Sequence, residues 1–429
     1  MLDIDLIRND PQGVEEALKH RDSSISLRPI LAVDKQRRKL AFQAETLRAT
    51  RNRTSQELSK LKDKPTELLE KMREVGREIK GLEDKLKDKD NKLRDLLLRL
   101  PNLPKNTTPL GLDSLSNRVL RTWGIVKQFD FKPLPHWNLA ETLDIIDFQR
   151  GAKLSGSRFF LLKGRGAQLQ RALTNWMLDL HIQQHGYTEI APPYLVKRET
   201  MIGSGNLPKF GDNLYHDEED DLWLIPTAEV PLTGLHREEI LEPTKLPLYY
   251  VAYTPCFRRE KAAAGRDTRG LKRVHQFDKV ELYKIVEPEK SDAELDGLLA
   301  NAAEIGWKLN IPYRVVELCT GDMGFPSAKS YDLEMYAPGC EEWLEVSSCS
   351  NCTDFQARRS GIRFRRHPGA RPEFPHTLNG SALALPRLMI AILETYQQRD
   401  GSIVIPEVLR PYTGFAKIEP LQKKSYGDN

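Results

Sequence analysis

The sequence predicts an α+β protein in which an antiparallel α-helical coiled-coil arm precedes a mostly antiparallel β-sheet flanked by helices. Two observations predict this fold class. Apolar residues recur with a heptad period from about residue 28 to 100, and strand-like runs alternate with helical stretches beyond residue 120. We expect an N-terminal domain at 1–104, a linker at 105–120, a main domain at 121–415 and a disordered tail at 416–429.

The composition is that of an ordinary soluble protein. Hydrophobic residues make up 39% and charged residues 29% of the 429 positions. No apolar run approaches the roughly 18 to 20 residues that a membrane span needs, and the start, MLDIDLIRNDPQG, has neither a secretory nor a transit signature. Five cysteines, an odd number, predict no disulfide framework. We therefore expect a cytoplasmic protein with no membrane partner.

Two long helices are predicted in the arm. The heptad positions of the first are Val33, Leu40, Leu47 and Leu61, with Ile30, Ala44 and Leu58 on the offset register. Those of the second are Met72, Ile79, Leu86, Leu93 and Leu100, with Val75, Leu82 and Leu96 on the offset register. Two such rows specify a coiled-coil seam. Because Lys64-Pro65-Thr66 interrupts the repeat and Thr66 can cap the next helix, we expect an antiparallel hairpin roughly 50 Å long.

The excess positive charge of the arm lies on its first helix. Residues 28–64 contain eleven Lys or Arg and four Asp or Glu, a net charge of +7, whereas residues 66–100 contain ten and nine, a net charge of +1. A one-sided excess favours contact with a polyanion such as a nucleic acid. The heptads alone are equally typical of a spacer or a dimerisation element, so both interpretations of the arm stay open at this point.

The main domain should contain a sheet and flanking helices. Strand-like runs lie at Leu248–Tyr253, Val280–Val286, Tyr313–Leu318 and Trp343–Val346. Helical stretches lie at about 166–184, 292–309 and 383–398. Because several strand runs are adjacent in sequence and joined by turns, we expect the sheet to be mostly antiparallel.

The densest polar cluster of the chain begins at Arg258-Arg259-Glu260 and continues through a charged, Gly-bounded loop to Glu281. Strand alternation would place Arg258 and Glu260 on one face and Arg259 on the other. A planar guanidinium suits phosphate oxygens, and a carboxylate beside it suits an amine or the amino group of adenine. The alternative interpretation is a salt-bridged hairpin on the surface.

Three segments, in order, resemble the signature motifs of class II aminoacyl-tRNA synthetases. Gly186–Leu195 is similar to motif 1, the dimer-interface helix and strand. Arg258–Glu281 is similar to motif 2, and Leu378–Glu394, which includes Arg387, is similar to motif 3. Any one of these motifs is weak alone, but three in order at plausible spacing are a strong signal.

Further segments resemble the seryl branch of these enzymes, the bacterial-type seryl-tRNA synthetase family. Pro226–Glu229 is similar to its serine-binding TxE loop, Leu344–Cys352 to its EVSSCSNC strand, and Gly203–Phe210 to its GxGxLPKF loop. The helical hairpin matches the tRNA-binding arm of the family, so the resemblance covers nearly the whole chain. It implies a serine–tRNA ligase, which activates L-serine with ATP to seryl-adenylate plus pyrophosphate and then transfers serine to the 3′-terminal ribose of tRNA(Ser).

The resemblance also implies roles for individual residues. Arg258 and Arg387 would be catalytic: Arg258 would bridge the α-phosphate and the serine carboxylate, while Arg387 and Arg273 would hold the distal phosphates. The remaining residues of the ATP site would be Arg259, Glu260, Val274, Phe277, Glu345, Val346, Ser347 and Ser348, with Glu260 on the adenine amino group and Phe277 stacked on the ring. Glu345 and Ser348 would ligate Mg²⁺. The serine site would contain Thr227, Ala228, Glu229, Arg258, Glu281, Asn379 and Ser381.

The residues expected in the serine site suit that substrate. A pocket of polar partners rejects an analogue that lacks the hydroxyl, because those partners would be left unpaired. Glu281 and Ser381 are suitable partners for the hydroxyl, and Glu229 or Glu281 could balance the ammonium group. For tRNA, the charge asymmetry points to the first helix, around Arg48, Arg51 and Arg53.

Two other functions stay open. One is a synthetase-like ligase with an acceptor other than tRNA, against which the basic arm argues. The other is an inactive coiled-coil interaction protein derived from the same fold, against which the intact set of ATP-site residues argues. A zinc site would need Cys340 and His367 to join the single Cys349-x-x-Cys352 pair, and we expect buried, reduced cysteines instead. The resemblance further implies a homodimer through motif 1.

Overall fold

The computed structural model describes residues 1–60, 65–261 and 269–421. The chain forms two compact units, Met1–Pro101 and Asn102–Asn429. Among the described residues, no helix combines the length and the apolar character that crossing a membrane requires.

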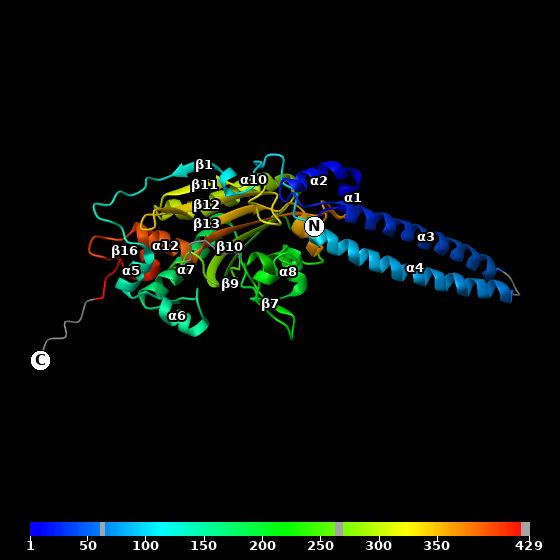
Figure 1. Ribbon diagram of the computed structural model, residues 1–429, viewed down its shortest axis with the longest axis horizontal. Helices are drawn as coiled ribbons and strands as arrows, with labels where there is room; N and C mark the ends of the chain where they lie inside the picture. The colour runs from blue at the N-terminus through cyan, green and yellow to red at the C-terminus, as the bar shows by residue number, and fades with distance from the viewer. Residues whose placement is uncertain (61–64, 262–268, 422–429) are drawn as a thin grey trace. The chain divides into compact units, whose positions relative to one another are not determined.

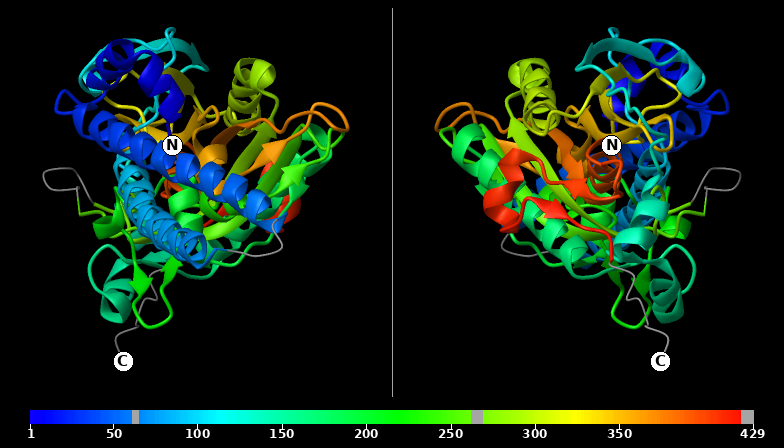
Figure 2. Two further views of the ribbon diagram at one scale, coloured as in Figure 1. Left: turned by 90° about the vertical axis from the view of Figure 1, so that its right-hand side faces the viewer. Right: turned by 90° about the vertical axis from the view of Figure 1, so that its left-hand side faces the viewer.

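The first unit is a helical hairpin with two short helices at its start. Its elements are α1 (Ile4–Asn9), α2 (Pro11–Lys19), α3 (Arg28–Ser59) and α4 (Thr66–Leu98). The two long helices lie side by side, as Figures 1 and 2 show, and this confirms the predicted coiled-coil arm. The seam buries residues of the predicted heptad rows, among them Val33, Ala44, Ile79 and Leu93. The expected cap was wrong in detail, because the N-cap of α4 is Pro65 and makes no side-chain hydrogen bond. Residues 61–64, including Leu61 of the heptad row, lie outside the described residues.

An ion-pair cluster joins the first short helix, α1, to α3. The carboxylate of Asp34 is buried, and it accepts hydrogen bonds from Arg8 Nε and from Arg38 Nε, each at 3.0 Å. A buried carboxylate must be paired to be tolerated, so Asp34 ties α1 to the base of the arm.

The second unit is built on an eight-stranded sheet with the order β1-β11-β12-β13-β15-β10-β9-β4. Its strands are β1 (Arg118–Trp123), β4 (Thr188–Glu189), β9 (Leu248–Phe257), β10 (Gln276–Val286), β11 (Tyr313–Glu317), β12 (Lys329–Ala337), β13 (Glu342–Asn351) and β15 (His376–Ala384). All neighbours pair antiparallel except β4 and β9, which pair parallel. The mostly antiparallel sheet is confirmed, and so are its four predicted strand runs in β9, β10, β11 and β13, although β11 ends one residue before the predicted Leu318.

Alternation along the central strand β10 separates the two faces of the sheet. Val280 and Leu282 belong to the main core, where α7 (Arg165–His185), α10 (Ser291–Lys308) and α12 (Leu385–Thr395) cover the sheet. Residues 277, 279 and 281 therefore point to the opposite face. That face is partly covered by α9 (Glu229–Gly234) and α11 (Phe355–Ser360), which leaves room for a cavity beside them.

Smaller elements complete the second unit. They are η1 (Ser114–Ser116), α5 (His136–Leu143), β2 (Ile146–Asp147), α6 (Phe148–Ser155), β3 (Leu161–Leu162), β5 (Leu195–Lys197), α8 (Arg198–Ser204), η2 (Gly211–Asn213), β6 (His216–Asp217), β7 (Leu222–Leu224), β8 (Ile240–Leu241), η3 (Pro288–Lys290), β14 (Arg363–Phe364), β16 (Ile403–Val404), η4 (Glu407–Leu409), α13 (Arg410–Thr413) and β17 (Lys417–Ile418). In the segment expected to be a disordered tail, β17 pairs with β16, and residues 422–429 lie outside the described residues.

Candidate active site

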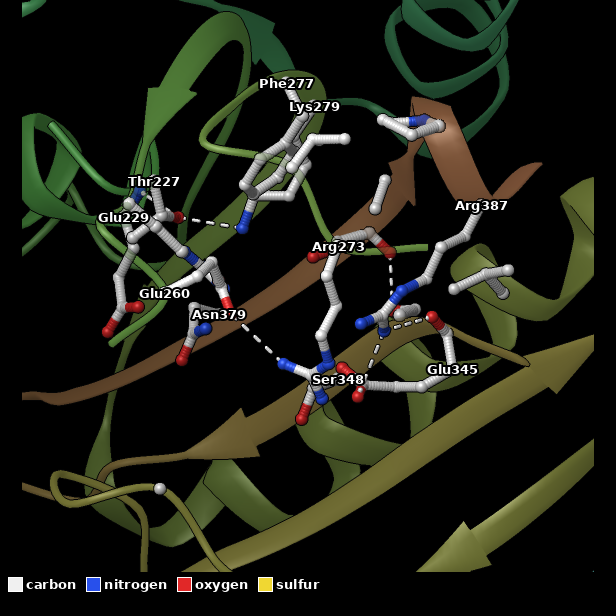
Figure 3. Close-up of a pocket in the computed structure, with 18 of the residues that line it drawn as sticks. Thr227, Glu229, Glu260, Arg273, Phe277, Lys279, Glu345, Ser348, Asn379 and Arg387 are labelled. Atoms are coloured by element: carbon white, nitrogen blue, oxygen red, sulfur yellow. Dashed lines mark hydrogen bonds and ion pairs between the residues drawn. The ribbon is translucent and has the colours of Figure 1, made fainter. Parts of the chain in front are cut away.

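A cavity of about 400 Å³ opens on the sheet face that the large helices leave free (Figure 3). Its walls come from the end of β9, the start of β10, the middle of β13, β15 and the first turn of α12. Fourteen of the residues predicted for the ATP and serine sites line it: Thr227, Glu229, Arg258, Glu260, Arg273, Val274, Phe277, Glu345, Val346, Ser347, Ser348, Asn379, Ser381 and, in the first turn of α12, Arg387.

One end of the cavity is formed by the hairpin of β9 and β10. Arg258 follows β9 directly, its guanidinium lies 5.1 Å from the ring centroid of Phe277, and its Nε donates to the carbonyl of Pro226 at 3.2 Å. Glu260 has a φ of 46° and accepts a hydrogen bond from an Arg273 terminal nitrogen at 3.1 Å. An aromatic face, two guanidinium groups and a carboxylate therefore share one wall, a combination suited to a nucleotide.

Arg387 closes the cavity from the first turn of α12. One of its terminal nitrogens donates to the backbone carbonyl of Glu345 at 2.7 Å and lies 3.2 Å from the carboxylate of the same residue. Its Nε donates to the carbonyl of Lys272 at 3.4 Å. These contacts aim the guanidinium across β13 and toward the segment that carries Arg273, as Figure 3 shows.

A β-bulge brings Glu345 and Ser348 to one face of β13. Glu345 pairs with Glu334 and Ser347 pairs with Leu333, so Val346 has no partner and the alternation shifts by one residue. Ser348, opposite Asp332, therefore points to the same side as Glu345 although the two are three residues apart.

Asp332 extends this group of oxygen ligands. Its Oδ1 is buried and has no hydrogen-bond partner among the described residues. Burial and the charge of Glu345 raise the pKa of the Asp332 carboxyl well above its usual range, although a hydrogen bond with Ser348 opposes the shift. Two carboxylates and a hydroxyl with an unsatisfied buried oxygen fit Mg²⁺, which prefers such ligands.

The other end of the cavity is a small polar pocket around Glu281. The Glu281 carboxylate is buried and pairs with the ammonium group of Lys279. It also lies 3.5 Å from Ser381 Oγ and 3.5 Å from Asn379 Nδ2, because Glu281 pairs with Ser381 in the sheet. Lys279 donates to Thr227 Oγ1 at 2.8 Å, so the predicted serine residues meet around one ammonium group.

Glu229, at the start of α9, lies beside this pocket. Its carboxylate accepts a hydrogen bond from Gln356 Nε2 at 2.6 Å, and its backbone N–H donates to Thr227 Oγ1 at 3.2 Å. Burial and the neighbouring Glu281 raise the pKa of Glu229 to about 7, against the opposing charges of Lys279 and Arg258. The pocket can therefore gain a negative charge near neutral pH.

Some residues predicted for the site do not line the cavity. Arg259 turns away, donates from Nε to the carbonyl of Leu214 at 2.8 Å and stacks over Tyr215 at 4.5 Å. Ala228 is fully buried in a neighbouring apolar cluster, and Glu281 lies behind the cavity wall. Arg259 turns away from the cavity as predicted, but the strand on which that alternation rested does not reach it: β9 ends at Phe257, and Glu260 has a φ of 46°.

Several residues of this region were not predicted from the sequence, among them two that contact predicted site residues, Lys279 and Asp332. Lys279 lies midway between Phe277 and Glu281 on one strand face, so alternation along β10 would have found it. Asp332 lies on β12, which was not among the predicted strands. Its period-2 pattern, with buried Tyr331 and Leu333 around it, was the available signal.

The cysteines and His367 do not form a zinc site among the described residues. Cys349 and Cys352 are buried, Cys340 lies 3.1 Å from Glu394, and exposed His367 contacts its neighbour's carbonyl. The segment 262–268 of the motif 2 loop lies outside the described residues.

The three arginines predicted to meet tRNA lie on α3 of the first unit. A terminal nitrogen of Arg48 lies 2.5 Å from a carboxylate oxygen of Glu83 on α4, while Arg53 is exposed and Arg51 is partly buried. Half of the Arg48 side chain is still exposed, so the pair does not remove it from the surface.

Comparisons with known proteins agree with this architecture. Residues 1–104 match the model of the seryl-tRNA synthetase N-terminal domain, and residues 211–396 match that of the class II tRNA synthetase core domain (G, H, P, S and T). The serine–tRNA ligase of Thermomicrobium roseum is 57% identical over 416 residues, which cover 96% of this chain and 94% of that protein.

Solved structures are similar over nearly the whole chain. The seryl-tRNA synthetase of Pyrococcus horikoshii complexed with ATP matches with a TM-score of 0.92 and 41% identity, covering 98% of this chain and all of that one. The cytoplasmic serine–tRNA ligase of Naegleria fowleri in complex with AMP matches with a TM-score of 0.87 and 30% identity, covering 98% of this chain and 99% of that one. The chain therefore belongs to the seryl-tRNA synthetase family.

Proposed function

We propose that the protein is a serine–tRNA ligase that activates L-serine with ATP and transfers it to tRNA(Ser). The observation that carries this proposal is the single cavity in which a nucleotide-type wall, around Arg258 and Phe277, faces a small polar pocket, around Lys279 and Glu281. The relatives named above, which include structures with ATP and AMP, support the same activity.

ATP fits the end of the cavity formed by the hairpin. Phe277 offers a ring on which adenine can stack, and Glu260 offers a carboxylate for its amino group. Arg273 and Arg387 lie on either side of the same space and suit the β- and γ-phosphates. Arg258 lies over Phe277 and its charge also reaches Glu229, so we assign it to contact both the α-phosphate and the serine carboxylate.

Glu345 and Ser348, with Asp332 behind them, are the residues that would hold Mg²⁺. When bound there, the ion would neutralise part of the charge on the phosphate oxygens. The shifted alternation at Val346 supports this, since it is the reason that Glu345 and Ser348 face the cavity together.

Serine fits the pocket around Glu281. Ser381 lines the cavity and can hydrogen-bond the serine hydroxyl, and the buried Glu281 carboxylate lies behind it, 3.5 Å from Ser381 Oγ. Alanine would leave this hydroxyl partner unpaired. Glu229 supplies a negative neighbour for the ammonium group near neutral pH.

The chemistry follows from this arrangement. A serine carboxylate oxygen attacks the α-phosphorus, the bond from that phosphorus to the bridging oxygen breaks, and pyrophosphate leaves. In the second step a terminal ribose hydroxyl of the tRNA attacks the serine carbonyl carbon, loses its proton, and AMP leaves. Positioning and charge neutralisation by the arginines supply most of the rate, as in other phosphoryl transfers.

The arm is the element that we assign to tRNA. Its first helix carries the positive excess, and Arg48, Arg51 and Arg53 lie on it. We also propose a homodimer through Gly186–Leu195, where Tyr194 and Leu195 are 43% and 48% exposed. The five cysteines are free thiols, which suits a reducing cytoplasm.

The test is a pair of assays on the purified chain: serine-dependent exchange of pyrophosphate into ATP, and attachment of serine to tRNA. We expect both. Exchange without attachment would indicate a ligase with another acceptor, and the absence of both would indicate an inactive interaction protein.

A further inference from the structure

A buried histidine outside the cavity connects two walls of the cavity, the segment before Arg273 and helix α12. His136, the first residue of α5, is fully buried, and its imidazole lies between the segment that leads into Arg273 and the buried Glu394 of α12. The backbone N–H of Leu271 lies 3.0 Å from its Nε2, and its Nδ1 lies 2.8 Å from a carboxylate oxygen of Glu394.

These contacts define how the ring is protonated. A backbone N–H can only donate, so Nε2 accepts and carries no proton. Nδ1 therefore carries the proton and donates to Glu394. Burial raises the pKa of Glu394, but hydrogen bonds from His136 and Cys340 outweigh it, so the pKa lies below its ordinary value and the group stays ionised.

The first turn of α5 contacts this segment through a second residue as well. The Arg269 guanidinium lies 4.7 Å and the Lys272 ammonium group 5.5 Å from the ring centroid of Trp137. Gly270 has a φ of 63°, and a Cβ added there would lie 2.0 Å from His136 Nε2. The backbone at 269–272 is thus shaped to lie on His136 and Trp137.

On the other side of the His136 ring, several hydrogen bonds hold the Glu394 carboxylate in place. This carboxylate accepts from the backbone N–H groups of His136, Gly339 and Cys340 at 2.8 to 3.0 Å, besides His136 Nδ1 and the Cys340 thiol. Glu394 lies on α12, the helix whose first turn carries Arg387, and Arg387 Nε donates to the carbonyl of Lys272.

The same atoms argue against a metal at this cluster. His136, Cys340 and Glu394 offer three ligand atoms within 4.8 Å of one another. Every carboxylate oxygen is already hydrogen-bonded, and burial together with Glu394 raises the pKa of the Cys340 thiol, which opposes the thiolate that a metal would need.

We propose that His136 is a positioning residue for nucleotide binding: by linking Leu271 to Glu394 it holds Arg273 and Arg387 at the spacing that the distal phosphates require. The inference rests on the proposed function, since it assigns these two arginines to ATP. The side chain of Leu271 is itself buried in the main core, and this packing already holds the segment against the protein. The hydrogen bond from its N–H to His136 additionally sets the orientation of the backbone that leads to Arg273.

The test compares two substitutions in the full-length protein. His136→Asn keeps a donor near Nδ1 but loses the acceptor for Leu271, whereas His136→Gln can place an oxygen near Nε2. In serine-dependent pyrophosphate exchange we expect His136→Asn to raise the KM for ATP about tenfold and to change the KM for serine less than about twofold. His136→Gln should raise the KM for ATP by less.

Two controls keep the result interpretable. His181→Asn removes another fully buried histidine, which lies on α7 away from the cavity, and it should lower the Tm without moving the KM for ATP. Gly270→Ala disturbs the same contact from the loop side, so it tests the proposal even where the His136 variants do not fold, and we expect the same selective rise in the KM for ATP.

The positioning role would be overturned if the KM for ATP and the KM for serine changed equally. It would also be overturned if folded His136→Asn and Gly270→Ala had a lower Tm but an unchanged KM for ATP. If the unsubstituted protein showed no serine-dependent exchange at all, the proposed function itself would fail. Exchange by the unsubstituted protein therefore distinguishes a failure of the proposed function from a failure of the positioning role.

Discussion

The arm and the cavity differ in how far apart in sequence their partners lie. In the arm, each helix needs only its own heptad rows to form a seam, and the two helices are consecutive in the chain. The cavity brings together Thr227, Arg258, Ser348 and Arg387 from four separate segments. The arm is therefore specified by a local period, and the cavity by the strand order and register of the sheet.

The difference has a functional counterpart in the proposed assignment. The cavity would carry activation of serine, and the arm would carry recognition of tRNA. If so, substitutions in the two units should separate the two half-reactions, and the following changes test that separation.

The largest effect should come from Arg258→Ala. Because its guanidinium lies between the nucleotide wall and the Glu281 pocket, its loss should lower serine-dependent pyrophosphate exchange by about 10³-fold. Arg259→Ala is the matched control: it removes the adjacent arginine, which turns out of the cavity toward Tyr215, and exchange should stay within about twofold. An equal loss in both variants would mean that charge in this hairpin, and not the position of Arg258, supports the reaction.

The next effect concerns the arm. The double substitution Arg51→Glu, Arg53→Glu on α3 should reduce kcat/KM for tRNA charging by about 10- to 100-fold, with a weaker salt dependence, while exchange stays unchanged. Lys85→Glu with Lys87→Glu makes the same charge change on α4 and should cost much less. If both pairs reduced charging equally, the tRNA would not prefer the first helix.

A smaller effect is expected from pH. The pKa of Glu229 is raised to about 7, so below that pH its carboxyl is neutral and above it the group is charged. If the carboxylate pairs with the ammonium group of serine, the KM for serine should fall as pH rises toward 7, by at most about tenfold per unit, and then level off. Glu229→Gln should remove this dependence. A KM for serine that is flat across pH 6 to 8 in the unsubstituted protein would exclude the pairing.

The smallest effect on activation should follow damage to the arm seam. Leu93→Ala leaves a hole between α3 and α4 and should destabilise the arm by about 2–5 kcal/mol, as followed by thermal unfolding. The KM for ATP and for serine should not change. A shift in either value would show that the two units are coupled during activation.

The same contrast explains how much of the molecule the sequence predicts. The helical hairpin and the strands β9, β10, β11 and β13 follow from residue periods, because each period is local. The residues around the cavity were named through resemblance to family motifs, and no local pattern alone would have grouped Thr227 with Ser381. Alternation along β10 was a local signal for Lys279 that was not used, whereas the role of Asp332 depends on the pairing of β12 with β13 and on the bulge at Val346.

Individual side chains also differ from what the sequence predicted, and for physical reasons. Arg259 was grouped with the ATP residues by resemblance, yet its hydrogen bonds to the carbonyls of Asn213 and Leu214 hold its guanidinium over Tyr215, outside the cavity. No sequence motif pointed to His136, because its proposed positioning role depends on two hydrogen bonds to residues 135 and 258 positions away in the chain. Pairings of that kind exist only once the sheet and its covering helices are assembled.

The most direct test of the central claim is pyrophosphate exchange into ATP, measured with each of the twenty amino acids in turn. The pocket around Glu281, Ser381 and Lys279 predicts exchange with serine, and rates lower by at least about 10³-fold with alanine, which leaves the hydroxyl partners unpaired. Exchange driven equally by alanine, or by another amino acid and not by serine, would contradict the assignment.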